Sequence, residues 1–345
     1  MHVDKTYCMN SFLQFRFIVD KDRGFKLGNQ PHYKELLDRN YVVEDSKDIE
    51  KAIEVQMSDL DKNSCALMLS SGIDSAILAK YMPKGAKAYT LRCIADSPVI
   101  DEAGTAAHIA QICGLEHCIV EVTWGDYQRV MPKLMQNKQA PIHSIEPLIY
   151  KACERAKEDG IKTLIFGESA DCLFGGLNQL FGRSWTTNEF ADRYDFVPVD
   201  KVLKEPQRIF EPYELYSVNG MVDVQRFMEN IFFKESMNSY YNACETGNIE
   251  FFAPYSHMKV AVKLDTERIG KGEGKYMVRE VFNRLYPNYS IPAKVPMPRA
   301  VTEWLKNWEG PHRPEFQPGC HKGLKGDQKW LIYCLEKFLD MIEVA

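Results

Sequence analysis

The sequence lacks the features that would assign it to a membrane or to nucleic acid. No segment approaches the roughly 18–20 consecutive apolar residues of a membrane-spanning helix. Residues 1–15 carry charges where a secretion signal needs an apolar core. The net charge of −5 offers no general attraction to nucleic acid, so such binding would need a local basic patch. We therefore expect a cytoplasmic protein whose partners are neither a membrane nor a nucleic acid.

The cysteines lack the spacing of a redox or zinc motif. No C-x-x-C occurs among the ten cysteines, so we expect reduced thiols rather than a disulfide framework. Cys113, His117 and Cys118 lie close together, but no second ligand pair of zinc spacing accompanies them. The pattern is better explained by a helix with Gly114 just after its end, followed by a strand. A metal site there is the minor alternative.

From residue 64 onward, short apolar segments alternate with helical patterns. The expected strands are 65–70, 86–94, 116–124 and 161–169, and the expected helices between them are 74–82, 101–115 and 146–160. Continuous apolar strands separated by helices predict an α/β fold, with a twisted parallel sheet covered by helices on both faces. In such sheets, ligands bind beyond the carboxyl ends of the strands.

The rest of the chain divides around this alternating region. Residues 1–60 form a short N-terminal portion, in which 12–20 has the aromatic and β-branched content of a strand. The α/β core spans 61–176. Residues 177–225 are aromatic, charged and punctuated by prolines, which predicts an insertion that shapes an acceptor site. Residues 226–345 have helical patterns and predict a C-terminal helical lobe.

The segment S-S-G-I-D-S follows the first expected strand. Gly72 permits positive φ and close approach of a ligand, and the amides of such a turn form an anion site. Ser70, Ser71 and Ser75 add hydroxyl donors. Asp74 would repel phosphate unless it holds a cation such as Mg²⁺. A tight turn with a capping Ser or Asp explains the segment equally well, and it is not a Walker A loop.

A second polar segment, F-G-E-S-A-D-C-L-F-G-G, follows the strand at 161–169. If a helix begins at Ser169 or Ala170, Glu168 and Asp171 project near the same mouth of the sheet. A capped helix with acidic residues at its positive end is the simpler explanation of this segment alone. Together, the two segments predict a nucleotide–Mg²⁺ site.

Both segments carry a specific family resemblance. L-S-S-G-I-D-S-A resembles the pyrophosphate-binding loop S-G-G-x-D-S of the N-type ATP pyrophosphatases. G-E-S-A-D-C-L-F-G-G resembles the G-E-G-A-D-E-L-F-G-G segment of asparagine synthetases. The pair Asp101-Glu102 and the segments at 270–282 and 291–305 also resemble family segments. The resemblance covers roughly residues 60–310 and implies an adenine nucleotide alpha hydrolase-like, Rossmann-like fold.

The resemblance implies where ATP binds. Leu69 and Leu91 would border the adenine and ribose, and Gly167 would offer backbone contacts. The residues that would hold the pyrophosphate part of ATP are Ser70, Ser71, Gly72, Asp74 and Ser75.

The resemblance also implies the metal ligands and the catalytic residues. Asp74 and Asp171 would bind Mg²⁺, while Glu168 would orient or deprotonate the attacking amine. Lys294 would stabilise charge that develops on the phosphates and the acyl centre. Lys275 matches a further family lysine, to which we give less weight.

Four departures from the family pattern bear on the substrate. Ser71 replaces the first glycine of the loop, and Cys172 replaces the second acid of the other segment. K-Q-A-P at 138–141 stands where many relatives have Asp-Glu-Pro, and His257 stands where the family has Asp. Because the last two could touch the acceptor pocket, asparagine is not the expected product.

The glutaminase domain of asparagine synthetases is also missing from the pattern. That domain has a cysteine nucleophile at position 2, where this chain has His2, and residues 1–60 are too short to form it. Cys8 cannot take the role, since the mechanism needs the free α-amine of the cysteine. We expect ammonia from solvent or from a separate amidotransferase or carrier, or else another amine as nucleophile.

These observations predict an ATP-dependent amide-forming ligase acting on a small-molecule carboxylate and an amine or ammonia. ATP would adenylate the carboxylate and release pyrophosphate, and the amine would then displace AMP. Two alternatives stay open. One is a pyrophosphate-loop enzyme that modifies a nucleobase or RNA, and the other is a non-catalytic nucleotide-binding module with a degraded site.

Overall fold

The computed structural model describes residues 2–35, 38–61, 63–291, 297 and 299–344. Its largest sheet has five strands in the order β10-β7-β4-β5-β6, and every neighbouring pair of strands is parallel. The strands are β4 (Cys65–Met68), β5 (Lys87–Cys93), β6 (Glu116–Val122), β7 (Thr163–Ile165) and β10 (Glu250–Phe252). This sheet confirms the predicted α/β fold.

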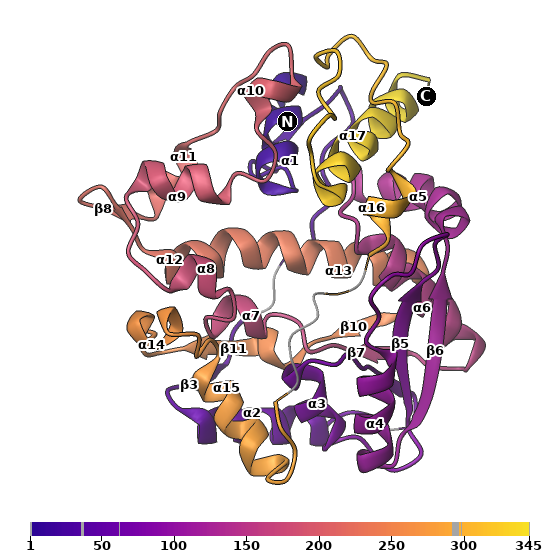
Figure 1. The fold of residues 1–345 in the computed structure, drawn as a ribbon, viewed down its shortest axis with the longest axis vertical. Coiled ribbons are helices and arrows are strands. Elements are labelled where there is room, and N and C mark those ends of the chain that lie inside the picture. The colour runs from indigo at the N-terminus through magenta and orange to yellow at the C-terminus, as the bar shows by residue number, and fades with distance from the viewer. Residues whose placement is uncertain (1, 36–37, 62, 292–296, 298, 345) are drawn as a thin grey trace.

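Helices cover both faces of the sheet (Figure 1). The chain runs outward from β4 to β5 and then to β6, with one helix in each connection. It then returns to β7, on the other side of β4, through two further helices. Because such crossovers are right-handed, opposite directions of travel place the two sets of helices on opposite faces. The outward pair is α3 (Ile73–Ala79) and α4 (Ala103–Cys113), and the return pair is α5 (Trp124–Lys138) and α6 (Glu146–Glu158).

Segments outside the core region complete the sheet and its surroundings. The edge strand β10 comes from the part of the chain that the sequence predicted to be helical, so that lobe also contributes to the sheet. The helix α13 (Phe233–Gly247) crosses the middle of the molecule and packs on α5, α6 and β10 (Figure 1). On the lower side, α2 (Ser46–Ser58) and α15 (Tyr276–Leu285) pack against each other.

The segment 12–20 does not form the predicted strand. Residues Lys5–Phe15 form the helix α1, whose N-cap Asp4 accepts a hydrogen bond from the Tyr7 amide. The helix ends at Arg16, which has a left-handed φ of 67°. Every residue from Tyr7 to Phe15 is buried, between α10, α17 and neighbouring loops. A short apolar run that is buried all round has no useful periodicity, which explains the error.

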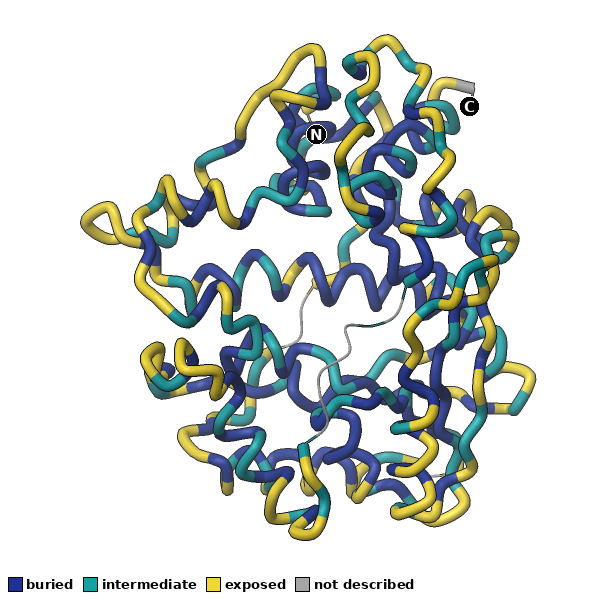
Figure 2. The backbone as a smooth tube through the Cα atoms, viewed as in Figure 1, coloured by how far each residue is buried: buried dark blue, intermediate teal, exposed yellow. Residues whose placement is uncertain are grey.

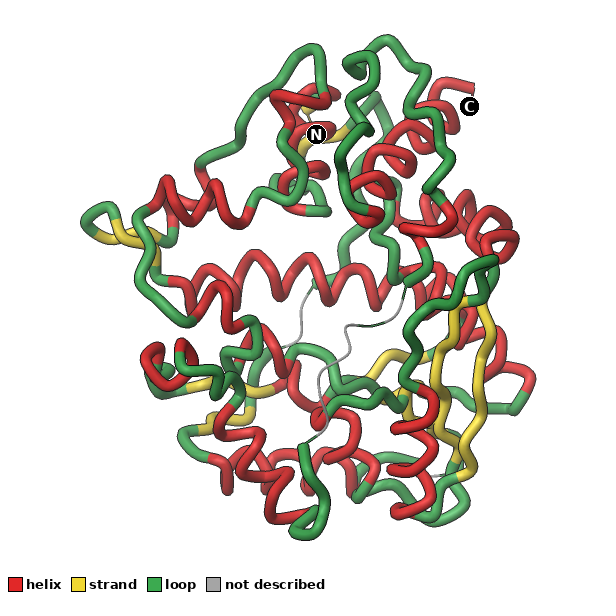
Figure 3. Tube along the Cα trace, in the orientation of Figure 1, coloured by secondary structure: helices red, strands yellow, loops and turns green. Residues whose placement is uncertain are grey.

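The remaining elements are short apart from the C-terminal helix (Figure 3). Within the described residues, none of the helices combines the length and the apolar character needed to span a membrane. The remaining helices are α7 (Ala170–Leu173), α8 (Asn178–Phe181), α9 (Thr187–Tyr194), α10 (Val199–Val202), α11 (Glu211–Leu215), α12 (Val224–Phe227), the π-helix η1 (Met228–Phe232), the 3₁₀-helix η2 (Pro254–His257), α14 (Thr266–Gly270), α16 (Val301–Trp304) and α17 (Gly326–Val344). The short strands are β1 (His2–Val3) with β2 (Arg23–Gly24), β3 (Tyr41–Val43) with β11 (Met258–Val260), and β8 (Ser217–Val218) with β9 (Met221–Val222).

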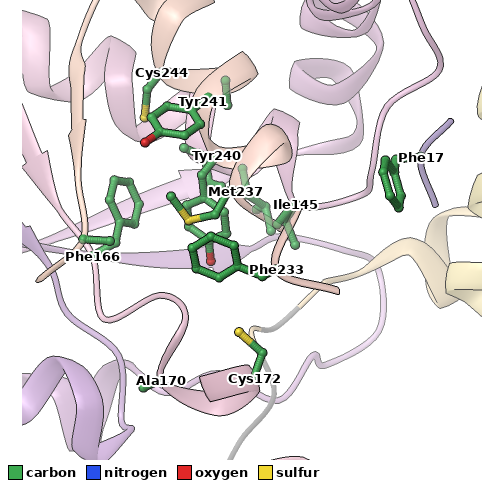
Figure 4. Packing of buried hydrophobic residues seen from close by; sticks show 14 of the residues in the cluster. Phe17, Ile145, Phe166, Ala170, Cys172, Phe233, Met237, Tyr240, Tyr241 and Cys244 are labelled. Atoms are coloured by element: carbon green, nitrogen blue, oxygen red, sulfur yellow. The ribbon is translucent and has the colours of Figure 1, made fainter. Parts of the chain in front are cut away.

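The buried core is continuous from the sheet through α13 to the helices above it (Figure 2). Phe166 and Tyr240 meet edge to face beneath α13, with ring centroids 5.1 Å apart (Figure 4). Cys172 lies in this packed region, and its thiol donates to the carbonyl oxygen of Ser169 at 3.2 Å. Cys172 is fully buried, so a carboxylate at this position would have to be desolvated.

Candidate functional site

A cavity of about 210 Å³ opens at the carboxyl ends of β4, β5 and β7. Parallel strands bring the residues that follow them to one edge of the sheet, which is why segments far apart in sequence meet here. Predicted nucleotide-binding residues that line the cavity are Leu69, Ser70, Gly72, Asp74, Ser75, Leu91 and Gly167. Predicted metal-binding and catalytic residues that line it are Glu168, Asp171 and Lys275.

The loop after β4 is held by its own hydroxyl groups. The Ser70 amide donates to Ser75 Oγ at 3.0 Å, the two serine hydroxyls are 2.9 Å apart, and the Gly72 amide donates to Ser70 Oγ at 3.1 Å. Gly72 does not use the positive φ that a glycine allows, because its φ is −78°. The loop thus turns the hydroxyls of Ser70 and Ser75 toward one another at the cavity.

Gly167 is required by close packing between the two polar segments. A Cβ atom at this position would lie 2.9 Å from the Ser75 amide nitrogen and 3.0 Å from Asp74 Cβ. No side chain fits at those distances without moving the backbone of the loop. The end of β7 therefore fixes the position of the loop that follows β4.

Lys275 brings the two predicted metal ligands together. Its ammonium group lies 2.6 Å from Asp74 Oδ2 and 3.0 Å from Asp171 Oδ1, and its side chain is 8% exposed. Burial alone would lower the pKa of Lys275, but the charges of Asp74 and Asp171 outweigh burial, so the pKa is raised. Lys275 is therefore charged at neutral pH, and it holds two carboxylates at one point of the cavity.

Glu168 lies under α13 on the neighbouring wall. The Ser236 hydroxyl donates to Glu168 Oε1 at 2.8 Å, and Tyr240 approaches the same carboxyl group. Burial raises the pKa of Glu168, while hydrogen bonds from the Ser169 amide, Ser236 and Tyr240 oppose the rise. A buried carboxylate with a raised pKa is a suitable proton acceptor.

The sequence analysis gave no role to several residues of this site. Tyr240, Glu102 and Arg279 all line the cavity, and Ser236 contacts Glu168. Arg279 lies in the first turn and a half of α15, and Lys275 is the N-cap residue of that helix, with a left-handed φ of 56°. Glu102 belongs to the Asp101-Glu102 pair, but the sequence does not indicate that it contacts Ser71.

Three predicted positions do not meet at the cavity. Ser71 is buried and does not line it; its amide and hydroxyl both contact Glu102 instead. His257 ends η2, where its ring lies beside Phe252, and it does not line the cavity either. Lys294 lies outside the described residues. Gly114, by contrast, follows α4 with a left-handed φ of 70°, as the sequence predicted.

Asp74 and Asp171 provide a donor set that suits Mg²⁺ together with phosphate oxygens. Mg²⁺ in nucleotide sites takes one or two carboxylates from the protein and the remaining ligands from phosphates and water. The two carboxylates converge within reach of one ammonium group, so one cation can face both. The described residues contain no cluster of three or more His, Cys, Asp and Glu side chains suited to a metal.

The fold and the cavity define a class: α/β proteins in which a serine-rich loop follows a central parallel strand and faces an acidic second loop. The asparagine synthase family model matches residues 46–259, more than half of the 345-residue chain. The chain therefore belongs to the asparagine synthase family.

Comparison with solved structures gives weak similarities. The chain is similar to an NH3-dependent NAD synthetase from Campylobacter jejuni, with 16% identity and a TM-score of 0.25, covering 38% of this chain and 58% of that one. It is also similar to an NMN synthetase from Francisella tularensis, with 13% identity and a TM-score of 0.26, covering 73% and 98%. No curated protein sequence gives a significant match.

Proposed function

We propose that this protein is an ATP-dependent ligase that forms an amide bond through an acyl-adenylate. One observation carries the proposal: Lys275, Asp74 and Asp171 converge beside a serine-rich loop, and Glu168 lines the same cavity. Phosphates, a divalent cation and a base are what carboxylate adenylation and amine attack require. Membership of the asparagine synthase family supports the same class of reaction.

The walls of the cavity suit ATP. Apolar groups of Leu69, Leu91 and Phe166 offer a surface for a purine ring, and the Ser70 and Ser75 hydroxyls suit phosphate oxygens. Arg279 lines the cavity and adds positive charge; its Nε donates to the Gly274 carbonyl oxygen at 2.7 Å. We assign the pyrophosphate part of ATP to the loop after β4.

Asp74 and Asp171 would hold Mg²⁺ in this assignment. The ion would neutralise charge on the phosphates of ATP. Lys275 keeps the two carboxylates together and limits their mutual repulsion, so the acidic pair is already assembled before any ligand enters. The lysine thereby acts on ATP through the position of both aspartates.

The reaction has two chemical steps. A carboxylate oxygen of the substrate attacks the α-phosphorus of ATP, the bond to the β-phosphate oxygen breaks, and pyrophosphate leaves. The amine nitrogen then attacks the acyl carbon, the bond between that carbon and the AMP oxygen breaks, and the amide forms. Glu168 accepts the proton that the nitrogen loses, and Ser236 and Tyr240 hold its carboxyl group in place.

The remaining assignments rest on the sequence. We propose that 177–225 shapes the acceptor side, that Lys294 stabilises charge on the reacting groups, and that the protein acts in the cytoplasm. We also propose boundaries near residues 60, 176 and 225, with β10 joining the core sheet from the C-terminal part. Ammonia from solvent, a separate amidotransferase or carrier, or another amine would supply the nitrogen.

Pyrophosphate release from ATP tests the proposal. Purified protein would be incubated with ATP, Mg²⁺ and a panel of small carboxylates, each with ammonium or an amine. We expect one combination to release pyrophosphate and AMP in equal amounts with formation of one amide, and Asp171→Asn to abolish both. Nucleotide binding without pyrophosphate release for any carboxylate would contradict the proposal and favour a non-catalytic module.

A further inference from the structure

Ser71, in the loop that follows β4, and Glu102, at the start of α4, form a buried contact. The Ser71 amide donates to Glu102 Oε2 at 2.9 Å, and the Ser71 hydroxyl donates to the same oxygen at 3.0 Å. Both residues are buried, with 2% and 7% of their surface exposed. The two segments lie 31 positions apart in sequence, so this contact ties the loop to the start of α4.

The contact joins a loop residue that does not line the cavity, Ser71, to a carboxylate that does, Glu102. Ser70, Gly72 and Ser75 line the cavity, whereas Ser71, between the first two, does not. Ser71 therefore cannot offer its hydroxyl to phosphate without giving up Glu102. Glu102 reaches the loop instead of capping its own helix, since it occupies the N-cap of α4 and makes no capping hydrogen bond there.

We propose that Glu102 is a positioning residue for phosphate binding: by holding the amide and hydroxyl of Ser71, it sets the loop so that Ser70, Gly72 and Ser75 face the phosphates of ATP. The inference rests on the proposed function of that loop. It also assigns a purpose to the serine that replaces a glycine, because a glycine would give Glu102 one hydrogen bond instead of two.

The electrostatics agree with this assignment. Burial raises the pKa of Glu102, and the two hydrogen bonds from Ser71 oppose the rise, so each bond favours the ionised carboxylate. A buried carboxylate that lost these donors would be costly, which makes the contact hard to break. The loop should consequently keep the same shape with and without ATP.

The test is a set of affinities for two probes, ATP and inorganic pyrophosphate, measured by calorimetry with Mg²⁺ on the full chain. We expect Glu102→Ala to weaken both affinities by about tenfold or more, the scale of a lost hydrogen bond to a charged group. Ser71→Ala should weaken them roughly three- to fivefold. Ser71→Thr, which keeps the hydroxyl, should remain within about twofold of the natural protein.

The double variant distinguishes this contact from general damage to the fold. If Ser71 acts through Glu102, Ser71→Ala should cost nothing more once Glu102 is alanine. Should Glu102→Ala fail to fold, the Ser71→Ala and Ser71→Thr pair still carries the test, since neither change removes a buried acid.

A control with the same hydrogen-bond pattern, in an exposed position, exists at the start of α5. Thr123 donates its amide and its hydroxyl to one oxygen of Asp126, at 2.9 and 2.7 Å, and neither residue lines the cavity. Thr123→Ala and Asp126→Ala should lower the melting temperature and leave both affinities unchanged.

Two results would overturn the inference. One is a Glu102→Ala protein that binds pyrophosphate as tightly as the natural protein, which would mean that Glu102 does not position the loop, or more tightly, which would mean that Glu102 competes with phosphate for Ser71. The other is a double variant whose losses multiply. If the natural protein binds neither ATP nor pyrophosphate, the proposed function itself fails, which is a different outcome from binding that Glu102→Ala leaves unchanged.

Discussion

Lys138 and Lys275 are both buried lysines that contact carboxylates, yet their surroundings differ. Lys138 lies 2.5 Å from Glu146, and the two side chains are 1% and 0% exposed. Glu146 also accepts hydrogen bonds from the His143 amide and the Asn242 side chain. The pair is enclosed between α5, α6 and α13, and its charges are matched one to one.

Lys275 instead contacts two carboxylates, Asp74 and Asp171, and all three residues line the cavity. A second negative charge beside one ammonium is unfavourable in a closed interior, but it is useful where a further cation can bind. The comparison shows that burial of an ion pair does not by itself indicate function. The feature that indicates function is a surplus of negative charge next to a cavity.

The largest expected effect comes from removing one carboxylate at the cavity. Asp74→Asn or Asp171→Asn should lower pyrophosphate release by about 10³-fold or more, because a metal ion contributes several kcal/mol to this kind of step. The double variant should cost little more than either single change, since ligands of one ion act as a unit. Near-normal release by either variant would remove that residue from the metal site.

Exchanging the two lysines for methionine should give opposite results. Lys138→Met leaves Glu146 buried without its counter-ion, so we expect a loss of about 3–5 kcal/mol of folding free energy. The melting temperature should fall by roughly 10 °C, with unchanged turnover per folded molecule. Lys275→Met should abolish turnover and cost less stability, because its two carboxylates face the cavity.

A second variant sharpens the result for Lys138. Lys138→Met combined with Glu146→Gln should recover much of the stability, since glutamine keeps an oxygen for the His143 amide and removes the buried charge. Loss of turnover in Lys138→Met, at temperatures where the variant is fully folded, would contradict a purely structural role for Lys138.

Glu168→Gln should separate the two chemical steps. General base catalysis contributes about 10²–10⁴-fold, so amide formation should fall by that factor, while exchange of pyrophosphate into ATP continues. In the natural protein the rate should fall as pH drops below the raised pKa of Glu168, because the base is then protonated. The variant should lack this dependence. A variant with the natural pH profile would exclude Glu168 as the base.

Local patterns in the sequence predicted four of the five strands of the sheet and the two polar segments at the cavity, whereas Leu69, Leu91 and Lys275 were implied by the family resemblance. Ser70, Asp74 and Gly167 come directly after apolar strands, and parallel strands place such residues together without further information. The same reasoning failed at 12–20, where the expected strand overlaps the end of α1, a helix that is buried on all sides from Tyr7 to Phe15 and has no amphipathic pattern.

What the sequence could not reveal were contacts between distant side chains. Nothing in the segment around Ser71 indicates that it faces Glu102 rather than the cavity, and the role of Lys275 depends on two aspartates far away in sequence. Ser236 and Tyr240 reach Glu168 only because α13 crosses above β7. These pairings are set by packing of whole elements, which one sequence does not display.

The smallest expected effects concern two polar residues of α13 that are six positions apart and point in different directions. The Ser236 hydroxyl contacts Glu168, and the Asn242 amide contacts Glu146. Ser236→Ala should lower turnover by roughly tenfold, since it removes one hydrogen bond that positions the base, and should leave the melting temperature nearly unchanged. Asn242→Ala should do the reverse, costing about 1–3 kcal/mol of stability because the buried Glu146 loses a donor. Thermal unfolding and amide formation, measured on the same preparations, would separate the two. If both variants lose stability and turnover in proportion, α13 acts as one structural unit, and the distinction between the enclosed pair and the cavity would fail.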